Sequence, residues 1–244
     1  IRIGPLVTCN VFRYPSLLAK IAATVDMISN GRLNFGIGAG WHEAEAAAYG
    51  IPFPKGGVRV EMVDEALTII KKLWTEDEAT FKGKYYSINK AVCLPKPVQK
   101  PHPPVLVGGG GDKMLRLIAR HANEWNSGFT SPDDFKAETA RLEKACKEAG
   151  QDISTIENTF QSRIIIAESD EAARRRAELW REERRGTPDD PDWKFAIKGS
   201  PQTCVDMLKA YTNVGVTHFT LLFADAAALK PLRLFAEGVL PEFR

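Results

Sequence analysis

Two glycine-rich segments are the parts of this 244-residue sequence best suited to bind a small molecule. The first is Gly36-Ile37-Gly38-Ala39-Gly40-Trp41, which follows a short apolar run. Glycine lets a flat ligand approach the main chain, and Trp41 adds a large stacking face beside it. The G-x-G-x-G spacing differs from the G-x-G-x-x-G of dinucleotide-binding folds, so a tight structural turn is an equal alternative.

The second segment is a run of four glycines, Gly108, Gly109, Gly110 and Gly111, after the apolar run PVLV. Amide groups at the start of a helix form an anion site, and the residues that follow are expected to be helical. Asp112-Lys113 stand where a Walker A loop needs Gly-Lys-Ser/Thr, which excludes that motif. We expect phosphate binding here in preference to a purely structural turn.

Trp41 and His42 are the candidate catalytic residues. His42 stands close to Glu43 and Glu45, and an imidazole beside carboxylates can transfer protons. The simpler alternative is a solvated first helical turn, in which acidic residues are favourable.

Composition excludes several classes of function. The sequence has 33 basic and 31 acidic side chains and a formal net charge of +2, which disfavours nucleic acid as a partner. Apolar runs fall short of the ~18 residues of a membrane span, so we expect no membrane partner. The four cysteines and four histidines are scattered, which predicts a reduced, cytoplasmic protein without a metal site.

Apolar runs and amphipathic helices alternate along the chain. In 15–28, Leu18, Ile21, Val25 and Ile28 predict one buried helix face, as do Val63, Leu67, Ile70 and Trp74 in 57–74. Further helices are expected at 112–121, from 132 to Gly150, after Ser169, from 201 to about 214, and at 226–240. Strands are expected at 1–8, 124–129, 159–167 and 218–223, and a strand that runs into glycines is expected within each of 33–40 and 104–113.

Two segments interrupt the alternation. Residues 80–104 predict a hairpin around Lys82-Gly83-Lys84, followed by an extended proline-rich insertion. Residues 186–200 predict a long loop, in which Lys194 and Lys198 could close over an anionic substrate as a lid, with a plain connection as the alternative.

The alternation favours an α/β fold with a parallel sheet in one domain over 1–244. A doubly wound sheet and a (β/α)₈ barrel both satisfy it. The barrel needs two more βα units than the roughly six in this sequence, and those units could precede Ile1, which reads as the middle of a fold.

Three stretches together resemble the bacterial luciferase-like flavin oxidoreductases, and most closely their branch that uses the deazaflavin coenzyme F420. They are residues 4–54, with GRLNFGIGAGW, residues 85–126, with KPVQKPHPPVLVGGGG, and residues 199–223. The resemblance implies a (β/α)₈ barrel, a small organic substrate and a homodimer.

The resemblance also assigns roles to residues. It implies a cis peptide at Leu6-Val7, next to Thr8, behind the deazaflavin ring. Gly38, Ala39, Gly40 and Trp41 are expected beside the ring, and Gly108 to Gly111 at the cofactor phosphate.

Two departures from the family pattern leave alternatives open. The first two βα units of the family, about 60 residues that carry catalytic acidic and histidine residues, do not appear in this sequence. Trp41 stands where some sugar-phosphate dehydrogenases of the family have a catalytic glutamate, which implies a different substrate. The alternatives are an FMN-dependent monooxygenase that uses reduced flavin and O₂, and a truncated, inactive paralogue.

Overall fold

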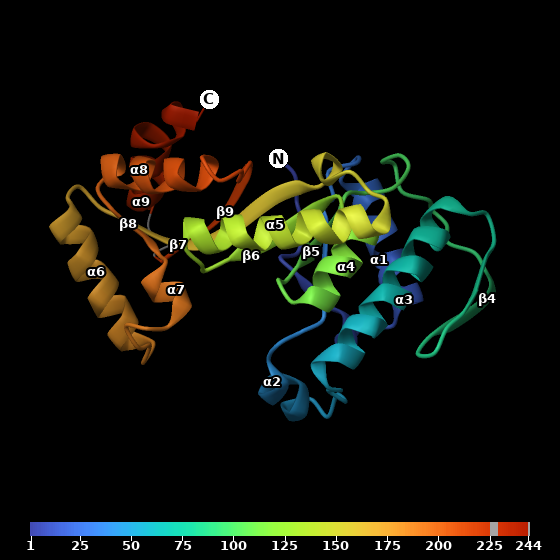
Figure 1. Cartoon of the computed structure of the whole chain (residues 1–244). Helices are drawn as coiled ribbons and strands as arrows, with labels where there is room; N and C mark the ends of the chain where they lie inside the picture. The colour runs from blue at the N-terminus through green and yellow to red at the C-terminus, as the bar shows by residue number, and fades with distance from the viewer. Residues whose placement is uncertain (225–228, 244) are drawn as a thin grey trace. The chain divides into compact units, whose positions relative to one another are not determined.

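The computed structural model describes residues 1–224 and 229–243, and the chain divides into two compact units (Figure 1). The first unit contains Ile1–Trp125 and Arg141–Ile156, and the second contains Asn126–Ala140 and Glu157–Arg244. Both glycine-rich segments belong to the first unit. The single domain expected for residues 1–244 stays a prediction.

Parallel strands make up the core of each unit, as the sequence predicts. In the first unit β2 pairs with β1 on one side and β5 on the other. In the second unit β7 pairs with both β8 and β9. The strands are β1 (Thr8–Cys9), β2 (Phe35–Gly38), β3 (Ala79–Lys82), β4 (Ser87–Ala91), β5 (Val105–Gly108), β6 (Glu124–Gly128), β7 (Glu157–Ile166), β8 (Ile197–Gly199) and β9 (His218–Phe223).

The helices fall between the strands, close to their expected positions. They are α1 (Pro15–Ile28), α2 (Glu43–Ala48), α3 (Gly56–Thr75), α4 (Asp112–His121), α5 (Pro132–Ala149), α6 (Asp170–Glu183), α7 (Pro191–Lys194), α8 (Pro201–Thr212) and α9 (Leu229–Gly238), with short 3₁₀ turns at Asn10–Phe12, Ile153–Thr155 and Leu240–Phe243. The hydroxyls of Ser169 and Ser200 accept first-turn amides, as N-caps should. The first residues of the helix expected at 226–240 lie outside the described part of the chain.

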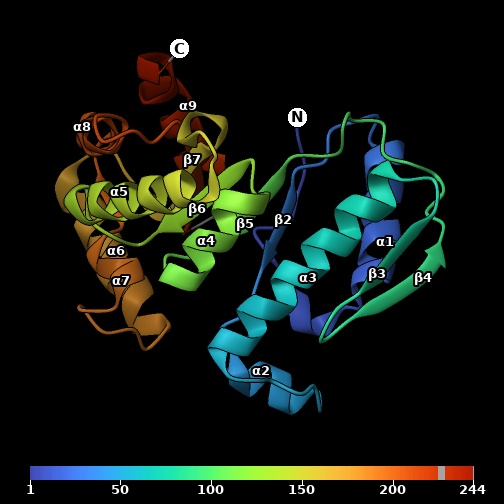
Figure 2. The same cartoon turned by 45° about the vertical axis from the view of Figure 1, so that its right-hand side comes forward.

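Helix α1 buries a different face from the one its large apolar residues predict. It lies beside α3 (Figure 2), and its buried residues include Leu18, Ala19, Ala22 and Ala23. Ile21 and Ile28 point outward, with 45% and 76% of their surface exposed. Small side chains let the two helices approach closely, so the prediction that Ile21 and Ile28 are buried is wrong. The stripe predicted on α3 is confirmed, since Val63, Leu67, Ile70 and Trp74 are all buried.

The first strand is shorter than expected. Only Thr8–Cys9 forms a strand, and Ile3 makes an isolated bridge to Leu33. Pro5 has no amide to donate to a ladder, and Gly4 lies directly against the carbonyl of Asn34. The continuous strand predicted for residues 1–8 is therefore wrong.

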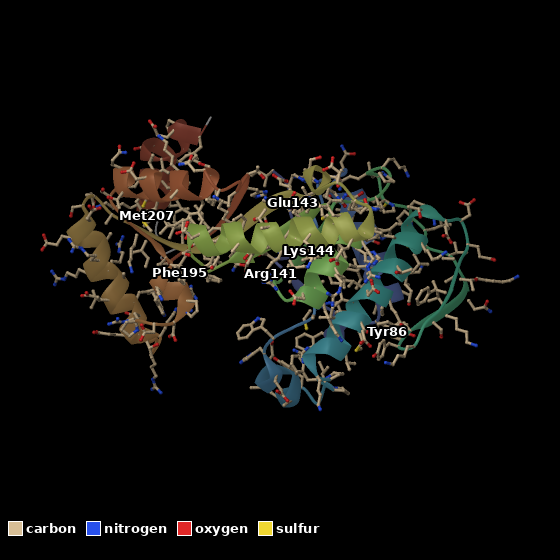
Figure 3. All side chains as sticks on the ribbon, viewed as in Figure 1. Tyr86, Arg141, Glu143, Lys144, Phe195 and Met207 are labelled. Carbon is tan, nitrogen blue, oxygen red and sulfur yellow. The ribbon has the colours of Figure 1, made fainter. Side chains whose placement is uncertain are left out.

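The predicted hairpin is confirmed as the antiparallel pair β3–β4. Its turn is held by one carboxylate of α3: Glu65 accepts the amides of Lys84, Tyr85 and Tyr86 at 2.7–3.0 Å. Tyr86 lies beside the part of α3 that carries Glu65 (Figure 3). The proline-rich insertion that follows is tied to α1 through buried Asp26, which accepts two hydrogen bonds from Gln99.

Residues 186–200 contain more regular structure than the long loop expected there, and the lid role of Lys194 and Lys198 stays a prediction. Helix α7 and strand β8 occupy about half of the segment. Trp193 is buried, and its indole packs edge-on against Trp180, with ring centroids 5.4 Å apart. Arg163 of β7 pairs with Asp192 at 2.8 Å. The burial of Trp193 and this ion pair stabilise the segment, although its amino-acid composition alone is typical of a loop.

The buried face of α1 is directly testable. Leu18→Ala should lower the free energy of unfolding by about 2–5 kcal/mol because it opens a cavity against buried neighbours. Ile21→Ala, the matched control three residues away, should change it by no more than about 0.5 kcal/mol. Urea unfolding of both variants measures the difference, and a larger loss for Ile21→Ala would contradict the observed packing.

Candidate functional site

The candidate site is built at the carboxyl ends of three parallel strands in the first unit. Cys9 of β1 is in register with Gly38 of β2, and Ile37 of β2 with Val107 of β5. The turns after β2 and β5 therefore leave the sheet at the same edge. The structure brings the two predicted glycine segments together, next to Thr8. This edge is where α/β sheets and barrels bind their ligands.

Close packing between β1 and the first glycine segment requires glycine. A Cβ atom on Gly38 would lie 2.8 Å from Cγ2 of Val7. Gly40 has φ +83°, and a Cβ there would lie 2.5 Å from Sγ of Cys9. The Leu6–Val7 peptide is cis, which confirms the expectation from the resemblance. Leu6, Val7 and Thr8 are all half-buried, so their free side is accessible to a ligand.

Trp41 and His42 lie at the exposed end of the same loop. Trp41 has 85% of its surface exposed, and its ring lies 4.9 Å from the His42 ring at an interplanar angle of 32°. Nδ1 of His42 is 3.9 Å from a carboxylate oxygen of Glu45. Glu43 and Glu45 occupy the first turn of α2, as the simpler interpretation predicts. The catalytic roles of Trp41 and His42 stay predictions.

The second glycine segment leads from β5 into the first turn of α4. Gly109 has φ +128°, and its carbonyl accepts a 2.9 Å hydrogen bond from the indole of buried Trp125. Gly111 is the N-cap of α4, and no atom lies within 4 Å of a Cβ placed on it. The first amides of a helix have no intrahelical acceptor. The segment therefore leaves open space in front of several free donors.

The charged side chains around this turn are paired with one another. Asp112 is in the first turn of α4, and a hydrogen bond from Arg141 lowers the pKa of its carboxyl group and balances its charge. Arg141 is on α5 (Figure 3). Lys113 follows, exposed and 3.5 Å from Glu61. The amide dipoles of the helix start then provide the local positive potential.

These residues fit a flavin-type cofactor, which needs a flat support for its ring and a cradle for its phosphate. The half-buried main chain at Ala39–Gly40 and the half-buried Leu6–Thr8 provide a surface on which the ring can lie. The open space at Gly111 and the first amides of α4 provide the cradle. Either a flavin or a deazaflavin satisfies both requirements.

Two side chains that shape the site were missed in the sequence. Arg59 donates to the carbonyls of Ala39 and Gly40, and Trp125 donates to that of Gly109. Arg59 stands 19 residues beyond the loop it holds and Trp125 stands 16 beyond Gly109. Neither lies in a motif, so sequence spacing carries no signal of these contacts.

Comparison with known proteins identifies a family. Residues 1–218 match the model of the family described as luciferase-like monooxygenase. An uncharacterized protein of Mycobacterium tuberculosis is 40% identical over 135 residues, which is 55% of this chain and 45% of that protein. The match thus spans about half the length of that relative. No helix in the described part of the chain is long and apolar enough to cross a membrane.

Relatives with described activities use two cofactors. An F420-dependent glucose-6-phosphate dehydrogenase of Amycolatopsis mediterranei is 26% identical over 271 residues, 100% of this chain and 80% of the relative. An FMNH₂-dependent dimethylsulfone monooxygenase of Pseudomonas putida is 28% identical and covers 66% of this chain and 43% of the relative.

A solved structure shows the fold. The F420-dependent tetrahydromethanopterin reductase of Methanopyrus kandleri superposes with a TM-score of 0.83 at 22% identity. The match covers 100% of this chain and 84% of that protein. The chain therefore has the α/β fold of the luciferase-like barrels, as predicted.

The requirement for glycine at the first loop generates a prediction. Gly40→Ala should destabilise more than Gly50→Ala, because both glycines have positive φ but only Gly40 lies against another atom. We expect about 1–2 kcal/mol for the backbone conformation at either position. Gly40→Ala should lose a further 1–3 kcal/mol, roughly, from the contact with Cys9. Equal losses in chemical unfolding would argue against the close approach.

Proposed function

This chain belongs to the luciferase-like monooxygenase family, and we propose that it is an oxidoreductase that transfers a hydride between coenzyme F420 and a small organic substrate. The observation that carries the proposal is the alignment of β1, β2 and β5, which brings a glycine-lined surface and a helix start to one sheet edge. The proposal includes a homodimer in the cytoplasm, which follows from the resemblance and the composition.

The protein's part in this reaction is to bind and orient. A bound deazaflavin supplies the hydride chemistry itself. Amides at Gly108–Gly111 bind the phosphate, and Leu6–Thr8 support the ring from behind. Trp41 lies on the substrate side, where its exposed indole offers a flat apolar face. A substrate with an apolar or planar part fits this face better than a sugar phosphate.

We prefer F420 to FMN as the cofactor, because the match to the F420-dependent dehydrogenase of Amycolatopsis mediterranei covers 100% of this chain. The second candidate is an FMN-dependent monooxygenase that uses reduced flavin and O₂, which the Pseudomonas putida relative supports over 66% of the chain. Both cofactors have a flat ring and a phosphate, so the glycine segments accept either. A catalytically inactive paralogue is the third candidate.

A parallel titration separates these candidates. The cofactor-free protein should quench or shift the fluorescence of F420 at lower concentration than that of FMN. Tighter binding of FMN would move the assignment to a monooxygenase. A folded protein that binds neither, as judged by circular dichroism, would favour the inactive paralogue.

Substitutions at a single residue, Gly111, test the proposed phosphate site. Gly111→Asp places a carboxylate at the N-cap of α4, where aspartate is well tolerated and no atom lies in its way. Repulsion of the phosphate should raise the cofactor Kd at least about tenfold while the unfolding midpoint is kept. Gly111→Ala, which adds a methyl group and no charge, should bind nearly as the parent does. Unchanged affinity in Gly111→Asp would refute the phosphate assignment.

A further inference from the structure

Arg59 of α3 holds the first glycine loop by its carbonyl groups. Its Nε donates to the carbonyl of Ala39 at 3.1 Å and its Nη2 to that of Gly40 at 3.3 Å, while Nη1 donates to the carbonyl of Pro54. The guanidinium also lies 3.9 Å from the centroid of the Phe53 ring. In the described part of the chain it forms no ion pair with a carboxylate, so its donors serve the main chain.

The direction of these carbonyls determines the direction of the neighbouring amides. The peptides between Ala39 and Gly40 and between Gly40 and Trp41 are trans, because the cis bonds of the described chain lie elsewhere. In a planar trans peptide the N–H points opposite to the C=O. Since both carbonyls face Arg59, the amides of Gly40 and Trp41 both point to the side away from Arg59.

Those two amides are free to bind a ligand. Within the described residues neither donates a hydrogen bond to a main-chain or side-chain acceptor. Gly40 is half-buried and Trp41 is exposed, so an incoming acceptor can reach both. The loop cannot easily rotate away, because the side chains of Cys9 and Phe53 both lie close to Gly40.

We propose that Arg59 is a positioning residue, which fixes the amides of Gly40 and Trp41 as a pair of donors to acceptor atoms on the edge of a flavin-type ring. This inference rests on the proposed function. The ring class shared by F420 and FMN has carbonyl oxygens on its pyrimidine part. Hydride uptake adds electron density to the ring, so donors placed at its edge bind the reduced form more strongly than the oxidised form.

Arg59→Lys tests the inference, because an ammonium keeps the charge but lacks the planar fork that reaches several carbonyls. Arg32→Lys is the matched control: Arg32 donates to the carbonyl of Ser29 at 2.7 Å, away from both glycine segments. The readouts are amide NMR spectra of ¹⁵N-labelled protein and calorimetric titrations with oxidised and with reduced F420 or FMN.

In the parent protein the amide signals of Gly40 and Trp41 should shift on cofactor addition, together with those of Gly109 to Gly111. In Arg59→Lys the first pair should lose its response while the glycines keep theirs. The affinity for reduced cofactor should fall about tenfold more than that for oxidised cofactor, as expected for the loss of one or two hydrogen bonds. Arg32→Lys should behave as the parent.

Three results would overturn the inference. If only the amide signals of Gly109–Gly111 shift when cofactor is added to the parent protein, the proposed contact of Gly40 and Trp41 with the ring is wrong, while the proposed function still stands. If Arg59→Lys binds the oxidised and the reduced cofactor equally more weakly, the role of Arg59 is structural only. Binding of neither cofactor by the parent rejects both proposals. If Arg59→Lys does not fold, Phe53→Leu keeps the guanidinium and removes the ring stacked on it, and should produce a smaller change in the same direction.

Discussion

The close approach of β1 to the glycine segment after β2 is the constraint on which the candidate site depends. A side chain at Gly38 or Gly40 would collide with Val7 or Cys9. Because those positions are glycine, the side chains of Val7 and Cys9 can lie directly against the main chain of the loop. The same absence of side chains leaves the loop with little stiffness of its own, since glycine is the residue with the most conformational freedom.

Stiffness is supplied from neighbouring elements. Arg59 holds the first loop through two carbonyls, and Trp125 holds the second through one. In both cases a partly or fully buried side chain donates to main-chain carbonyl groups of the loop. A rigid site can thus be made from flexible residues, provided that the surrounding helices and strands fix the carbonyls.

Local signals in the sequence were sufficient to predict most of the helices and strands. Serine caps, glycine stops and apolar spacing predict α1, α3, α4 and α8 within a few residues, and the resemblance adds the cis peptide at Leu6–Val7. The predictions failed where packing outweighs local pattern. Ile21 is apolar and regularly spaced, yet α1 buries Leu18 together with three alanines instead. Arg59 shows no motif because its role arises only when α3 meets the loop in three dimensions.

A site made mainly of main-chain groups has a consequence for specificity. Amides and glycines recognise the shape and acceptor atoms that flavins and deazaflavins share, so the framework proposed for this chain would accept either ring. Discrimination between substrates must then come from side chains that project beyond the framework. In the described part of the first unit, Trp41 is the large aromatic residue at the end of the glycine loop, and 85% of its surface is exposed. Its flat apolar face suits stacking and dispersion better than proton transfer, which is the contribution to substrate choice that we expect of it.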